Sequence, residues 1–111
     1  MSPVPAPTEP TVAALLKAGI AHQHGGRLAE AEAAYKQVLK AAPGHPDALH
    51  LLGALASAAG KPTLAAELIG KAIAAASDHA PFHHTLGQVL IADGKPMEAA
   101  ESFRRVIEID A

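Results

Sequence analysis

The sequence predicts an all-α protein built from repeated helix pairs, and three observations support this fold class. Half of its 111 residues are hydrophobic but only 3% are aromatic, and an alanine-rich core with so few aromatic residues favours closely packed helices over a β-sandwich. The chain also matches itself when it is shifted by 34 residues, the spacing from Gly19 to Gly53. Within each unit, two stretches with apolar residues at three- and four-residue intervals flank a glycine turn.

The repeat divides the chain into units at residues 12–45, 46–79 and 80–111, after a proline-rich segment at 1–11 that we expect to be disordered. Three columns of small residues coincide at this period: Gly19, Gly53 and Gly87; Gly26, Gly60 and Gly94; Ala31, Ala65 and Ala99. Together they predict one domain of helix–turn–helix units over residues 12–111.

The second unit illustrates how each helix pair should form. Asp47 is expected to cap the first helix and Gly60 to end it in a left-handed conformation. Pro62 should lie in the first turn of the second helix, where its missing N–H costs nothing. The apolar positions are Leu49, Leu52, Leu55 and Ala56 in the first helix and Leu64, Ala65, Leu68, Ile69, Ala72 and Ile73 in the second. The other units repeat this pattern after Gly26 and Gly94.

The first glycine column falls in the middle of the first helix of each unit. Glycine there costs about 1 kcal/mol relative to alanine. Because this unfavourable glycine recurs at the same position of all three units, we predict that the two helices of a unit cross closely at this point. The column of Ala31, Ala65 and Ala99 is expected to face the crossing from the second helix.

A 34-residue unit of this kind resembles the tetratricopeptide repeat. The first unit holds Leu15, Ala18-Gly19, His22, Gly26, Ala31, Tyr35, Val38 and Pro43 at the motif positions of that family. The second holds Leu49, Leu52-Gly53, Ala56, Gly60, Ala65, Ile69, Ala72 and Ser77, and the third His83, Leu86-Gly87, Leu90, Gly94, Ala99, Phe103, Val106 and Ala111. The resemblance covers residues 12–111. The departures are His83 in place of a large apolar residue and Ser77 and Ala111 in place of proline.

The resemblance implies a right-handed superhelical α-solenoid of antiparallel helix pairs with a concave groove that binds peptides or partner proteins. The usual lining positions of such a groove fall on Leu16, Ile20, Gln23, His24, Asp47, His50, Ala54, Ser57, Pro81, His84, Gln88 and Ile91. Some family members grip acidic chaperone tails with lysine, asparagine and arginine at these positions, and this chain has none of them there. We therefore expect an apolar or amphipathic protein or peptide segment as the ligand.

Other function classes find no support in the sequence. The formal net charge of −2 gives no attraction to nucleic acid, and no apolar run approaches the roughly 20 residues needed for membrane insertion. The chain contains no cysteine, which fits a reducing compartment, and we expect a cytoplasmic, bacterial protein. No nucleophile, phosphate-loop or zinc-protease motif is present, so we expect neither enzyme activity, nor a cofactor, nor a bound metal.

The seven histidines are expected to line the groove and the joints between units. His50 and His84 occupy the same position in successive units. Since imidazole titrates near pH 6.5, we hypothesise that these two side chains make ligand binding pH-sensitive.

The sequence ends without the polar capping helix that usually closes a repeat array. Some of Leu90, Phe103, Val106 and Ile107 should then be uncovered, either because the chain is an excised N-terminal piece of a longer protein or because a homo-oligomer covers them. The leading hypothesis is a non-catalytic protein–protein interaction scaffold. The alternatives are the recognition module of a larger bacterial enzyme, resembling a glycosyltransferase or sulfotransferase, and a self-assembling structural repeat protein.

Overall fold

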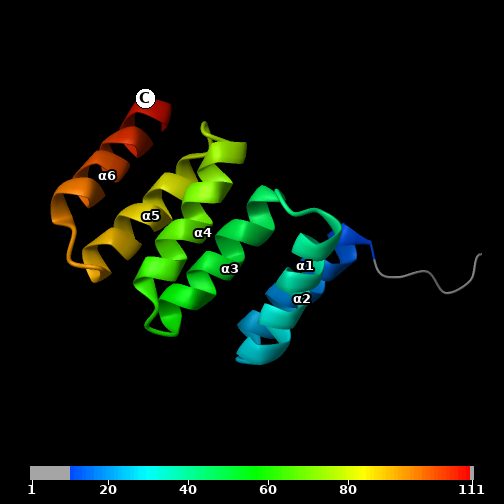
Figure 1. Ribbon diagram of the computed structural model, residues 1–111. Coiled ribbons are helices and arrows are strands. Elements are labelled where there is room, and N and C mark those ends of the chain that lie inside the picture. The colour runs from blue at the N-terminus through cyan, green and yellow to red at the C-terminus, as the bar shows by residue number, and fades with distance from the viewer. Residues whose placement is uncertain (1–10, 111) are drawn as a thin grey trace, which may run out of the picture.

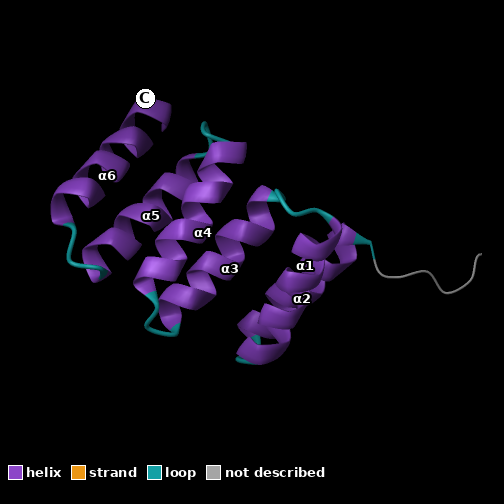
Figure 2. Cartoon of the chain, viewed as in Figure 1, coloured by secondary structure: helices purple, strands orange, loops and turns teal. Residues whose placement is uncertain are grey.

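The computed structural model describes residues 11–110 of the chain. Within this range the chain is all-helical, and short loops join its six helices (Figures 1 and 2). The helices are α1 (Val12–His24), α2 (Leu28–Ala41), α3 (Pro46–Ala58), α4 (Pro62–Ala75), α5 (Ala80–Ala92) and α6 (Pro96–Asp110). None of these helices combines the length and the apolar content that crossing a lipid bilayer requires.

The helices form three antiparallel pairs, α1/α2, α3/α4 and α5/α6, which stack in a row (Figure 1). Contacts between pairs run from α2 to α3 and from α4 to α5, and α3 also touches α5. The all-α fold class predicted from the sequence is therefore confirmed. The unit boundaries at 45/46 and 79/80 are the division of the chain that we propose.

The predicted disordered segment at 1–11 lies outside the described residues, with the exception of Thr11. The side chain of Thr11 accepts a hydrogen bond of 3.1 Å from the backbone N–H of Ala14. Thr11 is thus the N-cap of α1, where a hydroxyl satisfies one of the backbone donors that the first helical turn leaves free.

The same glycine turn closes each helix pair. Gly60 has a φ of 77°; its N–H bonds to the carbonyl of Ser57 at 3.0 Å, and the N–H of Lys61 bonds to the carbonyl of Ala56 at 2.9 Å. These two backbone hydrogen bonds define the Schellman motif, whose left-handed residue is glycine because a Cβ is disfavoured there. Gly26 and Gly94 repeat the turn with φ values of 77° and 74°. The predicted left-handed turns are confirmed.

The mid-helix glycines allow a large side chain of the second helix to lie against the backbone of the first. A Cβ on Gly53 would lie 2.7 Å from Ile69 Cγ1 and 3.2 Å from the carbonyl oxygen of Ala65. The corresponding pairs in the other units are Gly19 with Tyr35 and Gly87 with Phe103. The predicted close crossing is present. Ala65 is fully buried and its carbonyl oxygen faces Gly53, but the side chain that meets the glycine in each unit is the one four residues after the alanine.

The start of α3 corrects one prediction. The helix begins at Pro46, and its cap is His45, whose Nδ1 accepts a hydrogen bond of 3.3 Å from the N–H of Ala48. Asp47 therefore lies inside the first turn and is not the cap. Pro46 explains the shift, because its fixed φ and missing N–H suit the first helical position. The carboxylate of Asp47 still favours the helix by its interaction with the positive end of the helix dipole.

The departure from the family pattern at His83 is accommodated by a hydrogen bond. The side chain is buried in α5, and its Nε2 lies 2.8 Å from the carbonyl oxygen of Ser77. Since a carbonyl oxygen only accepts, Nε2 carries the proton. A buried imidazole with a satisfied donor thus replaces the usual large apolar residue.

Candidate partner-binding groove

Four of the predicted groove residues line one hollow, where the first helix pair meets the second. α1 contributes Leu16 and Ile20, and α3 contributes Asp47 and His50. Each pair is separated by three or four residues and therefore shares one face of its helix. The hollow has a volume of about 250 Å³ and is completed by Leu51, His79 and Phe82. We refer to these seven residues as the groove hollow.

His50 is the fixed polar side chain of the groove hollow. Its Nε2 lies 2.8 Å from Thr85 Oγ1, and its ring lies tilted against Phe82 with the ring centroids 4.8 Å apart. The Thr85 hydroxyl donates its single proton to the carbonyl of Pro81 at 3.0 Å, so it must accept from His50. The neutral imidazole of His50 therefore carries its proton on Nε2, and Nδ1 is a hydrogen-bond acceptor.

Burial favours the neutral form of this imidazole. Loss of solvation lowers the pKa of His50 below its ordinary value of 6.5; the charge of Asp47 opposes this shift, and His79 adds to it. Nδ1 has no partner among the described residues, and no buried polar side-chain atom of residues 11–110 is left unpartnered, so Nδ1 is accessible to solvent. The groove hollow thus combines apolar walls with two acceptors, the Asp47 carboxylate and His50 Nδ1.

Pro81 and His84 lie apart from the groove hollow. Together with Ala80, Thr85, Val106 and Asp110 they line a more open hollow of about 380 Å³ between α5 and α6. The ring of His84 is exposed and meets the ring of Phe103 edge-on, with the centroids 5.8 Å apart. His50 and His84 occupy equivalent positions in the sequence, yet their surroundings differ. Across residues 11–110, no three histidine or carboxylate side chains are grouped so as to hold a metal ion.

The other six predicted groove residues line neither hollow. Gln23 is half-buried, and its Oε1 accepts a hydrogen bond of 2.7 Å from the Tyr35 hydroxyl. That side-chain oxygen is therefore engaged within the first helix pair. Ala54 and Ser57 are half-buried, and His24, Gln88 and Ile91 are exposed.

Leu51 and Phe82 belong to the groove hollow although neither is among the positions predicted from the sequence, and His79 joins them from the joint between the second and third units. Phe82 is only 2% exposed, and its ring contacts both His50 and His79, the latter edge-on with centroids 4.4 Å apart. The sequence signal that could have placed Phe82 beside His79 is their spacing, because residues three apart lie close to one helical turn from each other. Leu51 directly follows His50 in the sequence.

The residues expected to be uncovered near the C-terminus differ in exposure. Ile107 is 70% exposed, whereas Leu90 is 6% exposed. Phe103 and Val106 are half-buried. Ile107 is thus the one member of this set that presents most of its side chain to solvent.

A family model of the tetratricopeptide repeat matches residues 16–81, and a second model of the same repeat matches residues 80–111. The chain belongs to the tetratricopeptide repeat family. No curated protein matches it significantly along the sequence. Similar solved structures include a mutant of the Thermobaculum terrenum O-GlcNAc transferase, which is 36% identical over 88% of this chain with a TM-score of 0.86.

Two further structures share the repeat fold. The Sgt2 tetratricopeptide repeat domain of Aspergillus fumigatus is 28% identical over 95% of this chain, with a TM-score of 0.85. The first repeat domain of Spaghetti (RPAP3), bound to the HSP90 peptide SRMEEVD, is 21% identical over 88% of this chain, with a TM-score of 0.84. The chain spans 19% of the transferase chain, 69% of the Sgt2 chain and 78% of the RPAP3 chain.

Proposed function

We propose that this tetratricopeptide repeat protein is a non-catalytic interaction scaffold that holds a peptide or partner segment in its concave groove. Membership of the family supports the proposal, because such repeats generally act as interaction modules. The observation that carries it is the groove hollow, where Leu16 and Ile20 face Asp47 and His50. Small sites of this kind, with apolar walls and few oriented polar groups, are typical of binding surfaces.

The charge of the groove indicates the class of segment that it accepts. The peptide bound to the RPAP3 domain is acidic. In this chain the predicted groove positions include the carboxylate of Asp47 and no lysine or arginine, so an acidic tail would be repelled. An apolar or amphipathic segment with a hydrogen-bond donor beside its apolar side chain fits better, because Asp47 and His50 Nδ1 both accept.

A second candidate function is the recognition module of a larger enzyme. The similarity to the O-GlcNAc transferase, at 36% identity, favours it, since the matched region is only 19% of that chain. Sequencing of the gene beyond codon 111 distinguishes the two, because a continuing transferase-like reading frame would support the module and a stop codon would count against it.

Self-assembly through Ile107 is the third candidate. The absence of cysteine fits the reducing compartment that we propose for this protein, the cytoplasm.

The scaffold proposal is tested with a variant that changes the polarity and the charge of two groove side chains. Ile20→Glu combined with Asp47→Lys changes two exposed side chains and should leave the fold intact. Met97→Glu on α6 is the matched control, because Met97 is 87% exposed and lies outside the groove hollow. Partners captured from the lysate of the source organism are identified by mass spectrometry with wild type, variant and control.

The recovered partner segment is then titrated into ¹⁵N-labelled protein. We expect the groove variant to lose the partner and the control to keep it, with amide shifts concentrated at Leu16, Leu51 and Phe82. A partner that the groove variant binds as tightly as wild type does would refute the proposal.

A further inference from the structure

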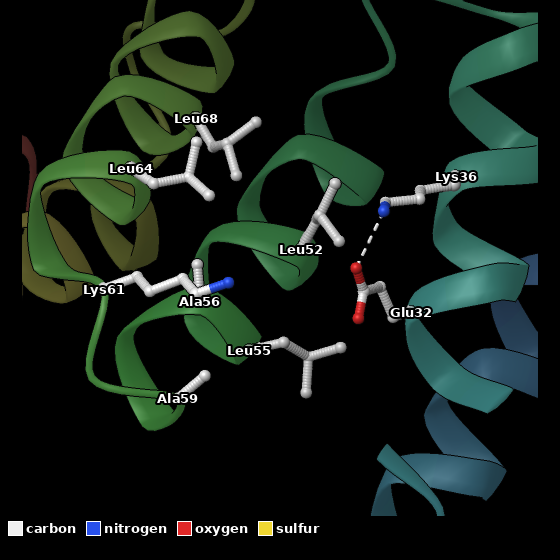
Figure 3. A pocket seen from close by; sticks show the side chains of 9 residues that line it. All are labelled: Glu32, Lys36, Leu52, Leu55, Ala56, Ala59, Lys61, Leu64 and Leu68. Atoms are coloured by element: carbon white, nitrogen blue, oxygen red, sulfur yellow. Dashed lines mark ion pairs between the residues drawn. The ribbon is translucent and has the colours of Figure 1, made fainter. Parts of the chain in front are cut away.

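A separate hollow lies between α2 and α4, with α3 as its floor (Figure 3). This α2–α4 hollow has a volume of about 300 Å³ and is lined by Glu32, Lys36, Leu52, Leu55, Ala56, Ala59, Lys61, Leu64 and Leu68. Its three α3 residues, Leu52, Leu55 and Ala56, and the C-cap Ala59 are related by three- and four-residue intervals and form one stripe along the helix. Leu52 follows His50 by two residues, which is about 200° around the helix. The α2–α4 hollow therefore lies on a different face of α3 from His50.

Comparison between the units shows that the fold does not require this apolar lining. At the two α4 positions the first, second and third units hold Glu30, Leu64 and Glu98, and Ala34, Leu68 and Ser102, respectively. Leu64 is 44% exposed, and an exposed position of this kind carries a glutamate in each of the other two units. Leucine at these two positions is thus a property of the second unit alone, and clustered exposed apolar side chains of this kind mark interaction sites.

The rim of the α2–α4 hollow carries an excess of positive charge. Glu32 pairs with Lys36 at 2.8 Å, and the hydrogen bond and charge of Lys36, with a smaller contribution from the charge of Lys61, hold the pKa of Glu32 below its ordinary value of 4.5. Glu32 is therefore ionised and already paired. Lys61 forms no ion pair with any residue in the described range, and Figure 3 shows its amine pointing from the start of α4 toward the middle of the lining residues.

We propose that the α2–α4 hollow is a second docking site, which accepts an amphipathic helix of a partner protein carrying a leucine-sized anchor and, within one turn of it, a carboxylate that pairs with Lys61. The leucines of α3 and α4 would bury the anchor, as in other grooves that bind one face of a helix. The carboxylate would balance the excess charge of the rim. This site is distinct from the groove hollow, because the two hollows share no lining residue.

The experiment uses a displayed library of helical peptides with one fixed central leucine and varied positions around it, selected on the whole chain. We expect the enriched peptides to carry Asp or Glu three or four residues from the leucine. The affinity of an enriched peptide is then measured by calorimetry for wild type and for variants of the hollow.

Three variants test the lining and the charge, and two of them use residues that the third unit already carries. Leu64→Glu with Leu68→Ser makes the wall polar, and Ala56→Leu places on the floor a larger side chain, the leucine that the third unit carries as Leu90. Each should weaken binding about tenfold or more, because the anchor loses its apolar contacts. Lys61→Gln should weaken binding about fivefold or less, as expected for an exposed ion pair.

Two controls separate this site from the rest of the surface. Leu28→Glu changes a half-exposed leucine of α2 outside the hollow, and Ile20→Glu with Asp47→Lys changes the groove. Both should bind the peptide like wild type. The proposal is overturned if no peptide is enriched, if the enriched peptides lack carboxylates, or if the variants of the hollow bind them unchanged. Self-association of wild type in light scattering that Leu64→Glu abolishes would assign the hollow to a second copy and would also overturn it.

Discussion

Gly19→Ala and Gly70→Ala are the same chemical change in the middle of two helices, and the structure predicts opposite effects on stability. Alanine is favoured over glycine inside a helix by about 1 kcal/mol. A Cβ on Gly70 in α4 meets no atom within 4 Å. Gly70→Ala should therefore raise the free energy of unfolding by about 1 kcal/mol.

At Gly19 the added methyl group collides with the ring of Tyr35, lying 2.8 Å from Cδ1 and closer still to Cε1. This ring is 0% exposed, and its hydroxyl is bonded to Gln23, so it has no space to move. Overpacking costs roughly 1–3 kcal/mol. With the upper value for a fixed ring, and after subtracting the helix preference of alanine, Gly19→Ala should lower the free energy of unfolding by about 2 kcal/mol.

Urea unfolding measures these effects with two probes. Circular dichroism follows all helices, and the fluorescence of Tyr35, the single tyrosine of a chain without tryptophan, follows the first helix pair. Gly87→Ala is an intermediate case, because Phe103 is half-buried and can turn toward solvent. The reasoning fails if Gly19→Ala stabilises the protein as Gly70→Ala does, since the ring would then not be fixed.

Three further predictions concern single polar contacts. Tyr35→Phe removes the hydrogen bond to Gln23 and should lower the free energy of urea unfolding by about 1 kcal/mol; an unchanged midpoint would show that water replaces the hydroxyl. His45→Ala removes the α3 cap and should cost roughly 1 kcal/mol in the same assay, whereas His45→Asp should retain the stability of wild type, because aspartate also caps well. Burial lowers the pKa of His50, so the unfolded chain binds a proton at this residue at a higher pH than the folded chain. Stability from this residue is present above about pH 6.5 and is lost as the pH falls below it. The melting temperature of wild type should therefore drop more between pH 7.5 and 5.5 than that of His50→Gln, and equal drops would contradict the assignment.

Much of the fold could be predicted because the repeat makes each local signal appear three times. Gly26, Gly60 and Gly94 gave the turns, since a left-handed residue after a helical stripe is a local requirement. The residue at which a helix begins is harder to predict when two capping patterns compete. Asp47 is a good cap, but Pro46 directly before it suits the first helical position better, and the helix therefore begins two residues earlier than predicted.

The candidate site was only partly predictable, because helical spacing assigns a residue to a face and does not fix its bonds. Leu16, Ile20, Asp47 and His50 share a hollow as expected for one face. Gln23 lies on the same face, but the Tyr35 hydroxyl, 12 residues away in the sequence, engages its side chain. Such contacts depend on the angle between two helices, which the sequence pattern alone does not specify.

The position of α3 between two hollows limits how a mutational scan of this helix can be interpreted. Its residues form the wall of one hollow and the floor of the other. A substitution that tilts or shifts α3 will change both surfaces at once, whichever side chain is replaced. Binding data from α3 variants such as Ala56→Leu or Asp47→Lys therefore assign a ligand to one surface only together with substitutions in the flanking helices. Substitutions in the flanking helices, Ile20 in α1 for one hollow and Leu64 in α4 for the other, give the assignment directly.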